Sequence, residues 1–312
     1  MFSPGNPITD RPPFQSLLMI TLIIIIGFIF VGPVLGVLLT MSFYSGDLVQ
    51  DIESATPKAG LVTALFVMQS TATLVGLILI PLIYITKVEH KSLRPLFPAQ
   101  ENLGSILIVV AAIGLIFPVA MSPLAEWNMN LTFPDFMSGF EDWAKLEEER
   151  LAKLTGLLTN IDSVGKLFAA LLVIGLLPAI GEELVFRGMI QQELWRGSHK
   201  IHFAIWTSAF IFSAIHMQFY GFIPRLLLGA LFGYLYYWSG NLLIPIFSHF
   251  FNNGFAVVMV YLHRTSVTSI DVENGEAVPL KYVLPCIVLT IALLYYARKH
   301  YLTPGYSGKT SL

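Results

Sequence analysis

Two adjacent glutamates lie inside an apolar run of this 312-residue chain, in the stretch LPAIGEELVFRGMI at residues 177–190. Glu183 and Arg187 are four residues apart, so on a helix they share a face and can form an ion pair. Glu182 is rotated by about 100° from Glu183, so both carboxylates cannot point at the arginine. We therefore expect Glu183 and Arg187 to be supporting residues and Glu182 to be the reactive one. The alternative is that both glutamates bind Arg187 in a purely structural cluster.

Other polar residues interrupt the apolar runs that follow, namely His216, His249, Asn252 and Asn253. His249 and Asn253 are four residues apart and share one helix face, whereas Asn252 points about 100° away and is a weaker candidate. Glu182 and His216 stand roughly 20 and 24 Å from the loop at 195–200, so antiparallel helices place them at a similar depth. Apolar residues would pack at less cost than such a group of polar ones, so a shared site is expected.

These residue types point to hydrolysis of a carbonyl compound. The predicted membrane spans contain no aspartate, no nucleophilic serine in a Gly-x-Ser-x-Gly or rhomboid-like setting, and no His-Glu-x-x-His. A carboxylate and a histidine can instead activate a water, while a second histidine and an amide stabilise the oxyanion. Alternatively, a divalent metal such as Zn²⁺, held by Glu182, His216 and His249, would activate the water.

The composition requires these groups to sit in a membrane. The chain is 55% hydrophobic and only 12% charged, about half the usual charged fraction of a soluble domain. The net charge of −2 offers no basic surface for nucleic acid, and the single cysteine excludes an intrachain disulfide. The expected partners are therefore the lipid bilayer and a peptide or membrane-protein substrate, with no nucleic acid.

The apolar runs predict an all-α membrane protein, a polytopic bundle of about eight transmembrane helices. The predicted spans are 17–41, 60–86, 104–124, 166–194, 201–218, 222–239, 241–262 and 280–297. The chain then divides into five segments: a cytoplasmic tail (1–16), three N-terminal helices (17–124), an extramembrane amphipathic segment (125–165), a catalytic four-helix core (166–262), and a last helix with a cytoplasmic tail (263–312). We expect the three N-terminal helices to be generic and lipid-facing. The segment 125–165 suits either the membrane interface or a solvated connector helix.

An even number of spans places both termini on one side of the membrane, and the basic residues indicate which side. Lysines and arginines concentrate in the short loops near 87–94 and 195–200 and near both termini. The positive-inside rule then predicts cytoplasmic termini, and we expect the plasma (inner) membrane of a bacterium.

Small and kinking residues predict close packing around these polar groups. Pro178 lacks an N–H four residues before Glu182, so it can kink the helix and free a carbonyl near the site. Gly229 and Gly233 are four apart and let a neighbouring helix approach closely.

Three stretches resemble a known family. EELVFR (182–187), FSAIH (212–216) and HFFNN (249–253) are similar, in order, to the Glu-Glu-x-x-x-Arg, Phe-x-x-x-His and His-x-x-x-Asn motifs of the CPBP family. This family of intramembrane proteases includes CAAX prenyl endopeptidases and bacteriocin-processing, Abi-like proteins. The resemblance covers roughly residues 166–262, and residues 1–165 match nothing comparable.

The resemblance implies a role for each matching residue. Glu182 and His216 would activate the catalytic water, His249 and Asn253 would form the oxyanion site, and Glu183 and Arg187 would support them. Both metal-dependent and metal-free mechanisms are described for the family; its precedent and the histidine–glutamate set favour a metal, and the metal-free route stays open. The expected activity is an intramembrane endopeptidase.

The alternatives are a non-enzymatic membrane protein of the same fold, acting in bacteriocin self-immunity or as a scaffold, and a transporter or proton relay. The complete set of motif residues argues against the first, and the lack of a broken-helix or inverted-repeat pattern argues against the second.

Overall fold

The structure is a computed structural model that describes residues 10–54, 58–270 and 278–300, and every regular element in these ranges is helical. The α-helices are α1 (Pro13–Ile24), α2 (Gly32–Thr40), α3 (Leu48–Glu53), α4 (Leu61–Thr71), α5 (Ile80–Ile83), α6 (Leu103–Met129), α7 (Ser138–Leu158), α8 (Val164–Ala170), α9 (Leu177–Val185), α10 (Gln191–Ser198), α11 (Ile201–Ala214), α12 (Phe222–Ser239), α13 (Leu243–Arg264) and α14 (Leu280–His300). The predicted all-α fold is confirmed. Residues 1–9 and 301–312 of the two predicted tails lie outside the described ranges.

Seven of the eight predicted spans are long and apolar enough to cross a membrane, counted over the described residues. Short π-helical segments such as Leu171–Leu176 and Phe186–Ile190 join α8, α9 and α10 into one rod, Val164–Ser198, of 35 residues. The fifth predicted span is shorter than expected, because α11 ends at Ala214 rather than Gln218. Its 14 residues are about 21 Å long, less than the roughly 30 Å of hydrocarbon in a bilayer.

The turn that ends α11 has a local cause. Met217 adopts a left-handed backbone conformation with φ of 56°, which a helix cannot continue through. A single 3₁₀ turn, Phe219–Gly221, then leads directly into α12, so α11 and α12 form a helical hairpin. The tip of this hairpin becomes part of the candidate site described below.

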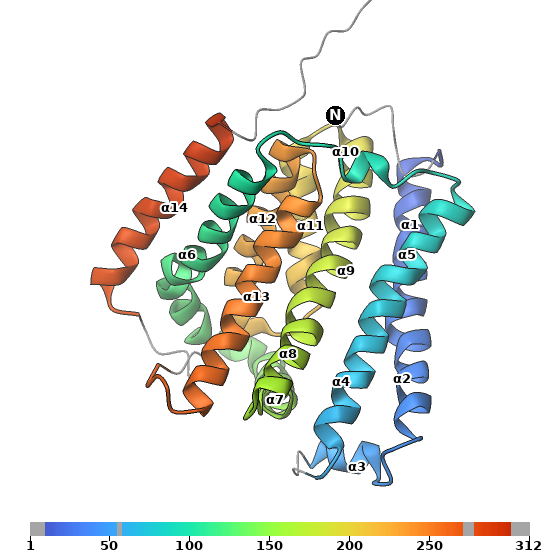
Figure 1. The fold of residues 1–312 in the computed structure, drawn as a ribbon, viewed down its shortest axis with the longest axis vertical. Helices are drawn as coiled ribbons and strands as arrows, with labels where there is room; N and C mark the ends of the chain where they lie inside the picture. The colour runs from blue at the N-terminus through green and yellow to red at the C-terminus, as the bar shows by residue number, and fades with distance from the viewer. Residues whose placement is uncertain (1–9, 55–57, 271–277, 301–312) are drawn as a thin grey trace, which may run out of the picture.

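The described chain begins and ends at the same end of the bundle, as the even number of spans predicts. Figure 1 shows the start of α1 and the end of α14 at the end where α10 lies, with α7 at the opposite end. Which of these two ends faces the cytoplasm stays a prediction.

The first two spans form a glycine-lined hairpin at one edge of the bundle. A Cβ atom on Gly32 would lie 2.6 Å from Ala72 Cα, and one on Gly76 would lie 2.4 Å from Phe28 Cα, so any larger residue there would push the backbones apart. Helix α9 packs against this hairpin in the same way, since a Cβ on Gly181 would lie 2.7 Å from Leu77 Cβ. The hairpin therefore supports the helix that carries both glutamates.

Helix α6 belongs to the core, which corrects the prediction that the first three spans are generic lipid-facing helices. Its residues Ile106, Val110 and Ile113 are buried in a cluster with side chains of α12 and α13. Figure 1 shows α6 between α14 and the α12–α13 pair. Hydropathy gave no sign of this, because a lipid-facing and a buried apolar helix have similar composition.

The segment 125–165 is helical over most of its length, and its first residues extend a membrane helix. Helix α6 continues to Met129, past the predicted boundary at 124. Helix α7 then packs onto the α11–α12 connection, where Phe140 and Trp143 lie 5.0 and 5.4 Å from Phe219, measured between ring centroids. The amphipathic helix expected in this segment thus rests on the tip of the helical hairpin.

Candidate active site

The predicted ion pair between Glu183 and Arg187 is present and lies in the protein interior. Arg187 Nη1 donates to Glu183 Oε1 at 2.8 Å, and the two side chains are 1% and 0% exposed. Arg187 Nη2 donates to the backbone carbonyl of Gly229 at 2.7 Å, a contact that the close packing at this glycine permits. The guanidinium also lies 4.9 Å from the centroid of the Phe212 ring. This cluster ties α9 and its π-helical extension to α11 and α12.

Glu183 also orients His249. His249 Nδ1 lies 2.8 Å from Glu183 Oε1, and since an ionised carboxylate only accepts, Nδ1 carries the proton. The opposite ring nitrogen, Nε2, then faces Glu182 Oε2 at 3.8 Å. The imidazole is further fixed by stacking on Phe232, with ring centroids 4.8 Å apart. His249 is therefore held by one glutamate and presented to the other.

Glu182 has the opposite environment to its neighbour. Its side chain is 16% exposed and borders a cavity, whereas the Glu183 side chain is fully buried. The rotation of about 100° between consecutive helical residues accounts for this separation. Glu182 lies near the middle of the rod Val164–Ser198, roughly 27 and 24 Å from its ends. The expected division of positions between the two glutamates is thus present.

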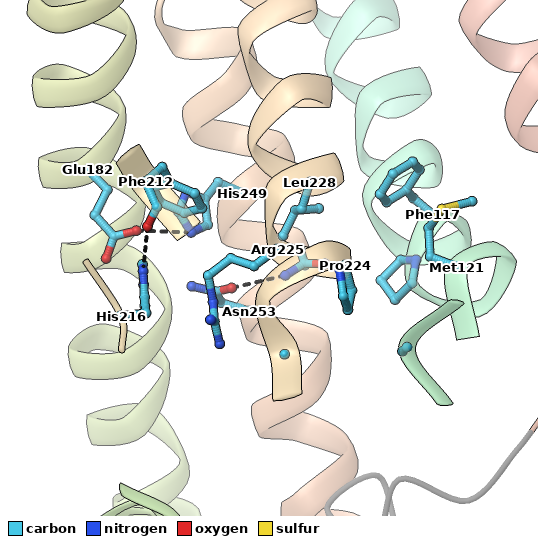
Figure 2. Close-up of a pocket in the computed structure, with 14 residues that line it drawn as sticks. Phe117, Met121, Glu182, Phe212, His216, Pro224, Arg225, Leu228, His249 and Asn253 are labelled. Carbon is cyan, nitrogen blue, oxygen red and sulfur yellow. Dashed lines mark hydrogen bonds and ion pairs between the residues drawn. The ribbon is translucent and has the colours of Figure 1, made fainter. Parts of the chain in front are cut away.

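His216 reaches the same cavity from the end of α11. Its Nδ1 lies 2.7 Å from the carbonyl oxygen of Phe212, so Nδ1 donates and the neutral ring keeps a lone pair on Nε2. Figure 2 shows Glu182, His216 and His249 around one space. Helices α9 and α13 and the turn that follows α11 therefore contribute one group each.

Asn253 is held by the carbonyl that Pro178 frees. Proline has no N–H to donate to the residue four positions earlier, which is Ile174. Asn253 Nδ2 donates to that carbonyl oxygen at 3.3 Å, as the sequence predicted for a freed carbonyl near the site. Asn252 Nδ2 in turn donates to Asn253 Oδ1 at 3.0 Å, and both amides line the cavity. Asn252 is thus closer to the site than its helical position suggested.

The cavity has a volume of about 410 Å³, and its walls are of two kinds. The polar wall contains the four residues predicted to be catalytic, Glu182, His216, His249 and Asn253, together with Asn252 and Arg225. The apolar wall includes Phe117, Pro118, Met121 and Ala125 of α6 and Pro224 and Leu228 of α12. Such a volume is within the roughly 300–1,000 Å³ of small-ligand sites.

Sequence reasoning missed Arg225. It lies four residues into the predicted span 222–239, in the run FIPRLLLG, where an arginine is easily taken for a residue at the membrane surface. The structure places it in the cavity because α11 is short, so α12 begins beside the other polar groups. The sequence signal for it is an arginine four residues inside an apolar run, because charged residues within membrane spans usually mark a functional site.

The metal-ligand set predicted from sequence is not assembled in this arrangement. Among the described residues, no three histidine, cysteine, aspartate or glutamate side chains lie close enough to form a metal site. The 3.8 Å between His249 Nε2 and Glu182 Oε2 shows that two of the three predicted ligands are neighbours. Zinc in catalytic sites usually has three protein ligands, so the arrangement does not fit a bound metal without movement of a side chain.

The comparisons with known proteins agree with the motifs. Residues 164–255 match the family model for the type II CAAX prenyl endopeptidase Rce1-like proteins. The uncharacterized protein YpbD of Bacillus subtilis (strain 168) is 35% identical over 79 residues, which is 24% of this chain and 37% of that protein. The membrane-embedded CAAX protease MroQ of Staphylococcus aureus (strain USA300) is 38% identical over 88 residues, 26% of this chain and 35% of that protein.

The chain thus matches little more than a third of the length of these two curated relatives. No solved structure gives a significant match. The matched segment contains both glutamates, Arg187, both histidines and Asn253. The resemblance drawn from the three motifs is confirmed, since residues 164–255 match the Rce1-like family model and a relative of the chain is named as a CAAX protease.

Proposed function

We propose that the chain is an intramembrane endopeptidase, in which Glu182 activates a water to hydrolyse a peptide bond of a peptide or membrane-protein substrate. The observation that carries the proposal is the contrast between the two glutamates, one buried and paired and one facing the cavity. Among the described residues, Glu182 has no lysine or arginine within ion-pair distance, and its neighbour is His249 Nε2 at 3.8 Å. A carboxylate held in this way at membrane depth is expensive, which favours a functional role. The family of residues 164–255 supports peptidase activity.

The cavity offers two acceptors for the attacking water. One is the carboxylate of Glu182, and the other is Nε2 of His216, whose Nδ1 proton is committed to the Phe212 carbonyl. A water that donates to both is oriented with its lone pair toward a substrate carbonyl. Glu182 takes the first proton as the water oxygen bonds to the carbonyl carbon, a step of general base catalysis.

The developing oxyanion requires hydrogen-bond donors. His249 can donate from Nε2 only when its ring carries both protons, because Nδ1–H is directed at Glu183. The Glu183 carboxylate stabilises such an imidazolium, as a buried carboxylate does for a histidine in hydrolase triads. Asn253 provides a second donor, since only one of its two amide hydrogens is needed for Ile174.

The intermediate then collapses with proton balance. The carbon–nitrogen bond breaks, and the leaving amine takes the proton that Glu182 received from water. The products are a carboxylic acid and an amine, and Glu182 returns to its ionised form. This sequence uses no group beyond the chain's own residues and one water.

A divalent metal such as Zn²⁺ remains the competing proposal for water activation. When bound by Glu182, His216 and His249, it would lower the pKa of the water and polarise the carbonyl. The described residues do not form such a three-ligand set as they stand. The two mechanisms differ in their response to chelation.

The test uses full-length protein in lipid nanodiscs and a library of membrane-spanning peptides, with prenylated and unmodified members. We expect cleavage by the wild-type protein and none above background by Glu182→Gln at equal amounts of folded protein. Absence of cleavage with every peptide, by protein that is correctly folded, would instead support a non-enzymatic protein of this fold, in bacteriocin self-immunity or as a scaffold.

A further inference from the structure

Arg225 is a partly buried cation in the same cavity as the proposed catalytic groups, and the proposed hydrolysis does not use it. Within the part of the chain that the structure describes, no carboxylate lies within 4.0 Å of its guanidinium. Its Nη2 donates to Gln218 Oε1 at 2.7 Å, while Nη1 is buried with no hydrogen-bond partner among the described residues. Figure 2 shows Arg225 among the cavity-lining residues with Glu182 and His216.

The other arginine of the core shows what a structural role looks like. Arg187 is paired with a carboxylate and a backbone carbonyl, so its charge is neutralised inside the bundle. Among the described residues, Arg225 instead has one neutral amide oxygen as a hydrogen-bond partner, and Glu148 and Glu182 attract its charge from beyond ion-pair distance. A charged residue at membrane depth is costly to insert, so an incompletely paired one indicates a functional site.

We propose that Arg225 binds a carboxylate of the peptide substrate and thereby positions the scissile bond at Glu182. The inference rests on the proposed peptidase function and adds a specificity-determining residue to it. A planar guanidinium recognises a carboxylate through parallel N–H donors, and Arg225 lines the cavity in which the substrate carboxylate would lie. The first turn of α12, which carries Arg225, adds positive potential from the helix dipole.

The hydrogen bonds around Arg225 hold it in place for such a ligand. Gln218 fixes one amino group of the guanidinium, and its amide reaches Glu148 of α7 at 3.5 Å. Asn128 of α6 donates to the Phe219 carbonyl at 3.0 Å and accepts from the Ile223 N–H at 2.7 Å, so it fixes the start of α12. A pre-organised guanidinium loses little freedom when a carboxylate binds.

Two parts of a peptide offer this chemistry, the free C-terminal carboxylate and the side chains of aspartate and glutamate. The experiment therefore uses matched peptides that differ in one group. A cleaved peptide is prepared with a free or an amidated C-terminus, and with each acidic side chain changed to its amide. The value of kcat/KM is measured for wild type, Arg225→Gln and Arg225→Lys in phosphatidylcholine nanodiscs.

One matched pair should favour the acid by about 10–100-fold in the wild type, the range of a charge-assisted hydrogen bond. The peptide pair that shows this ratio identifies whether Arg225 binds the C-terminal carboxylate or an acidic side chain. Arg225→Gln should reduce the ratio to within about threefold, and Arg225→Lys should give an intermediate ratio because it keeps the charge and loses the planar fork. The control Arg150→Gln, an exposed arginine of α7, should keep the wild-type ratio.

A binding measurement separates this inference from the proposed function. The same peptide pairs are titrated into the Glu182→Gln protein, with and without Arg225→Gln. If no peptide is cleaved by the wild type but acids bind more tightly through Arg225, the peptidase proposal fails and the carboxylate site stands. Equal binding and equal cleavage of acids and amides overturn the inference. It is also overturned if phosphatidylglycerol nanodiscs abolish the preference, since a lipid phosphate would then be the ligand of Arg225.

Discussion

Replacing Arg187 by alanine should lower the free energy of unfolding by about 3–5 kcal/mol, the usual cost of removing one partner of a buried ion pair. We expect the loss for Arg187→Ala to lie near the upper end of this range, because the Glu183 side chain is 0% exposed and would remain as an uncompensated charge. The Gly229 carbonyl would also lose its donor, and the Phe212 ring would lose its contact with the cation. These losses share one cause, so they should not be added to the estimate.

The measurement is equilibrium unfolding in mixed micelles with increasing SDS, followed by far-UV circular dichroism. Arg150→Ala is the matched control, since Arg150 pairs with Glu147 on the exposed surface of α7 and such pairs contribute about 0–1 kcal/mol. Adding Glu183→Gln to Arg187→Ala should recover part of the loss, because the penalty comes from the charge that remains. The reasoning is refuted if Arg187→Ala is as stable as Arg150→Ala.

Three further predictions concern the proposed chemistry and the orientation. Glu182→Gln should reduce kcat at least about 100-fold while the unfolding curve stays that of the wild type, because it removes a base and keeps the shape. If Glu182 works without metal, activity should survive extended chelation, and His249→Ala should lose about 100–1,000-fold in rate because an oxyanion contact is missing. The metal mechanism would instead be established if chelation abolishes activity, Zn²⁺ restores it, and His216→Ala and His249→Ala both lack bound metal. A cysteine introduced at Ser198 in a Cys286→Ala background should be labelled only after the membrane is opened, and labelling from outside would reverse the predicted orientation.

The sequence supports predictions where helical geometry alone decides the outcome. The pairing of Glu183 with Arg187 follows from a spacing of four residues, and the exposure of Glu182 follows from the turn of about 100°. The carbonyl of Ile174 is available to Asn253 because Pro178 cannot bind it, which is also a property of one helix. Each of these statements needs only the identity of residues a few positions apart.

The missed features depend on contacts between distant segments. The end of α11 at Ala214 carries no proline or glycine signal, and the left-handed Met217 that ends it is stabilised by a hairpin tip that packs against α6 and α7. Arg225 becomes a cavity residue only because this hairpin is short. The contribution of α6 depends on the rotation of that helix about its axis, which a uniformly apolar sequence does not encode.

The adjacency of Glu182 and Glu183 is the arrangement that a single helix needs to hold two carboxylates at one depth with opposite tasks. A pair separated by four residues would share a face, so both would enter the core or both would face the cavity. Consecutive positions instead direct one carboxylate to Arg187 and the other to the cavity, and His249 connects them, with Nδ1 at 2.8 Å from Glu183 and Nε2 at 3.8 Å from Glu182. The buried charge of Glu183 thus fixes both the helix and the histidine that faces Glu182. Stability and the proposed reactivity are therefore assigned to different glutamates, which is why the two substitutions Arg187→Ala and Glu182→Gln are expected to separate them.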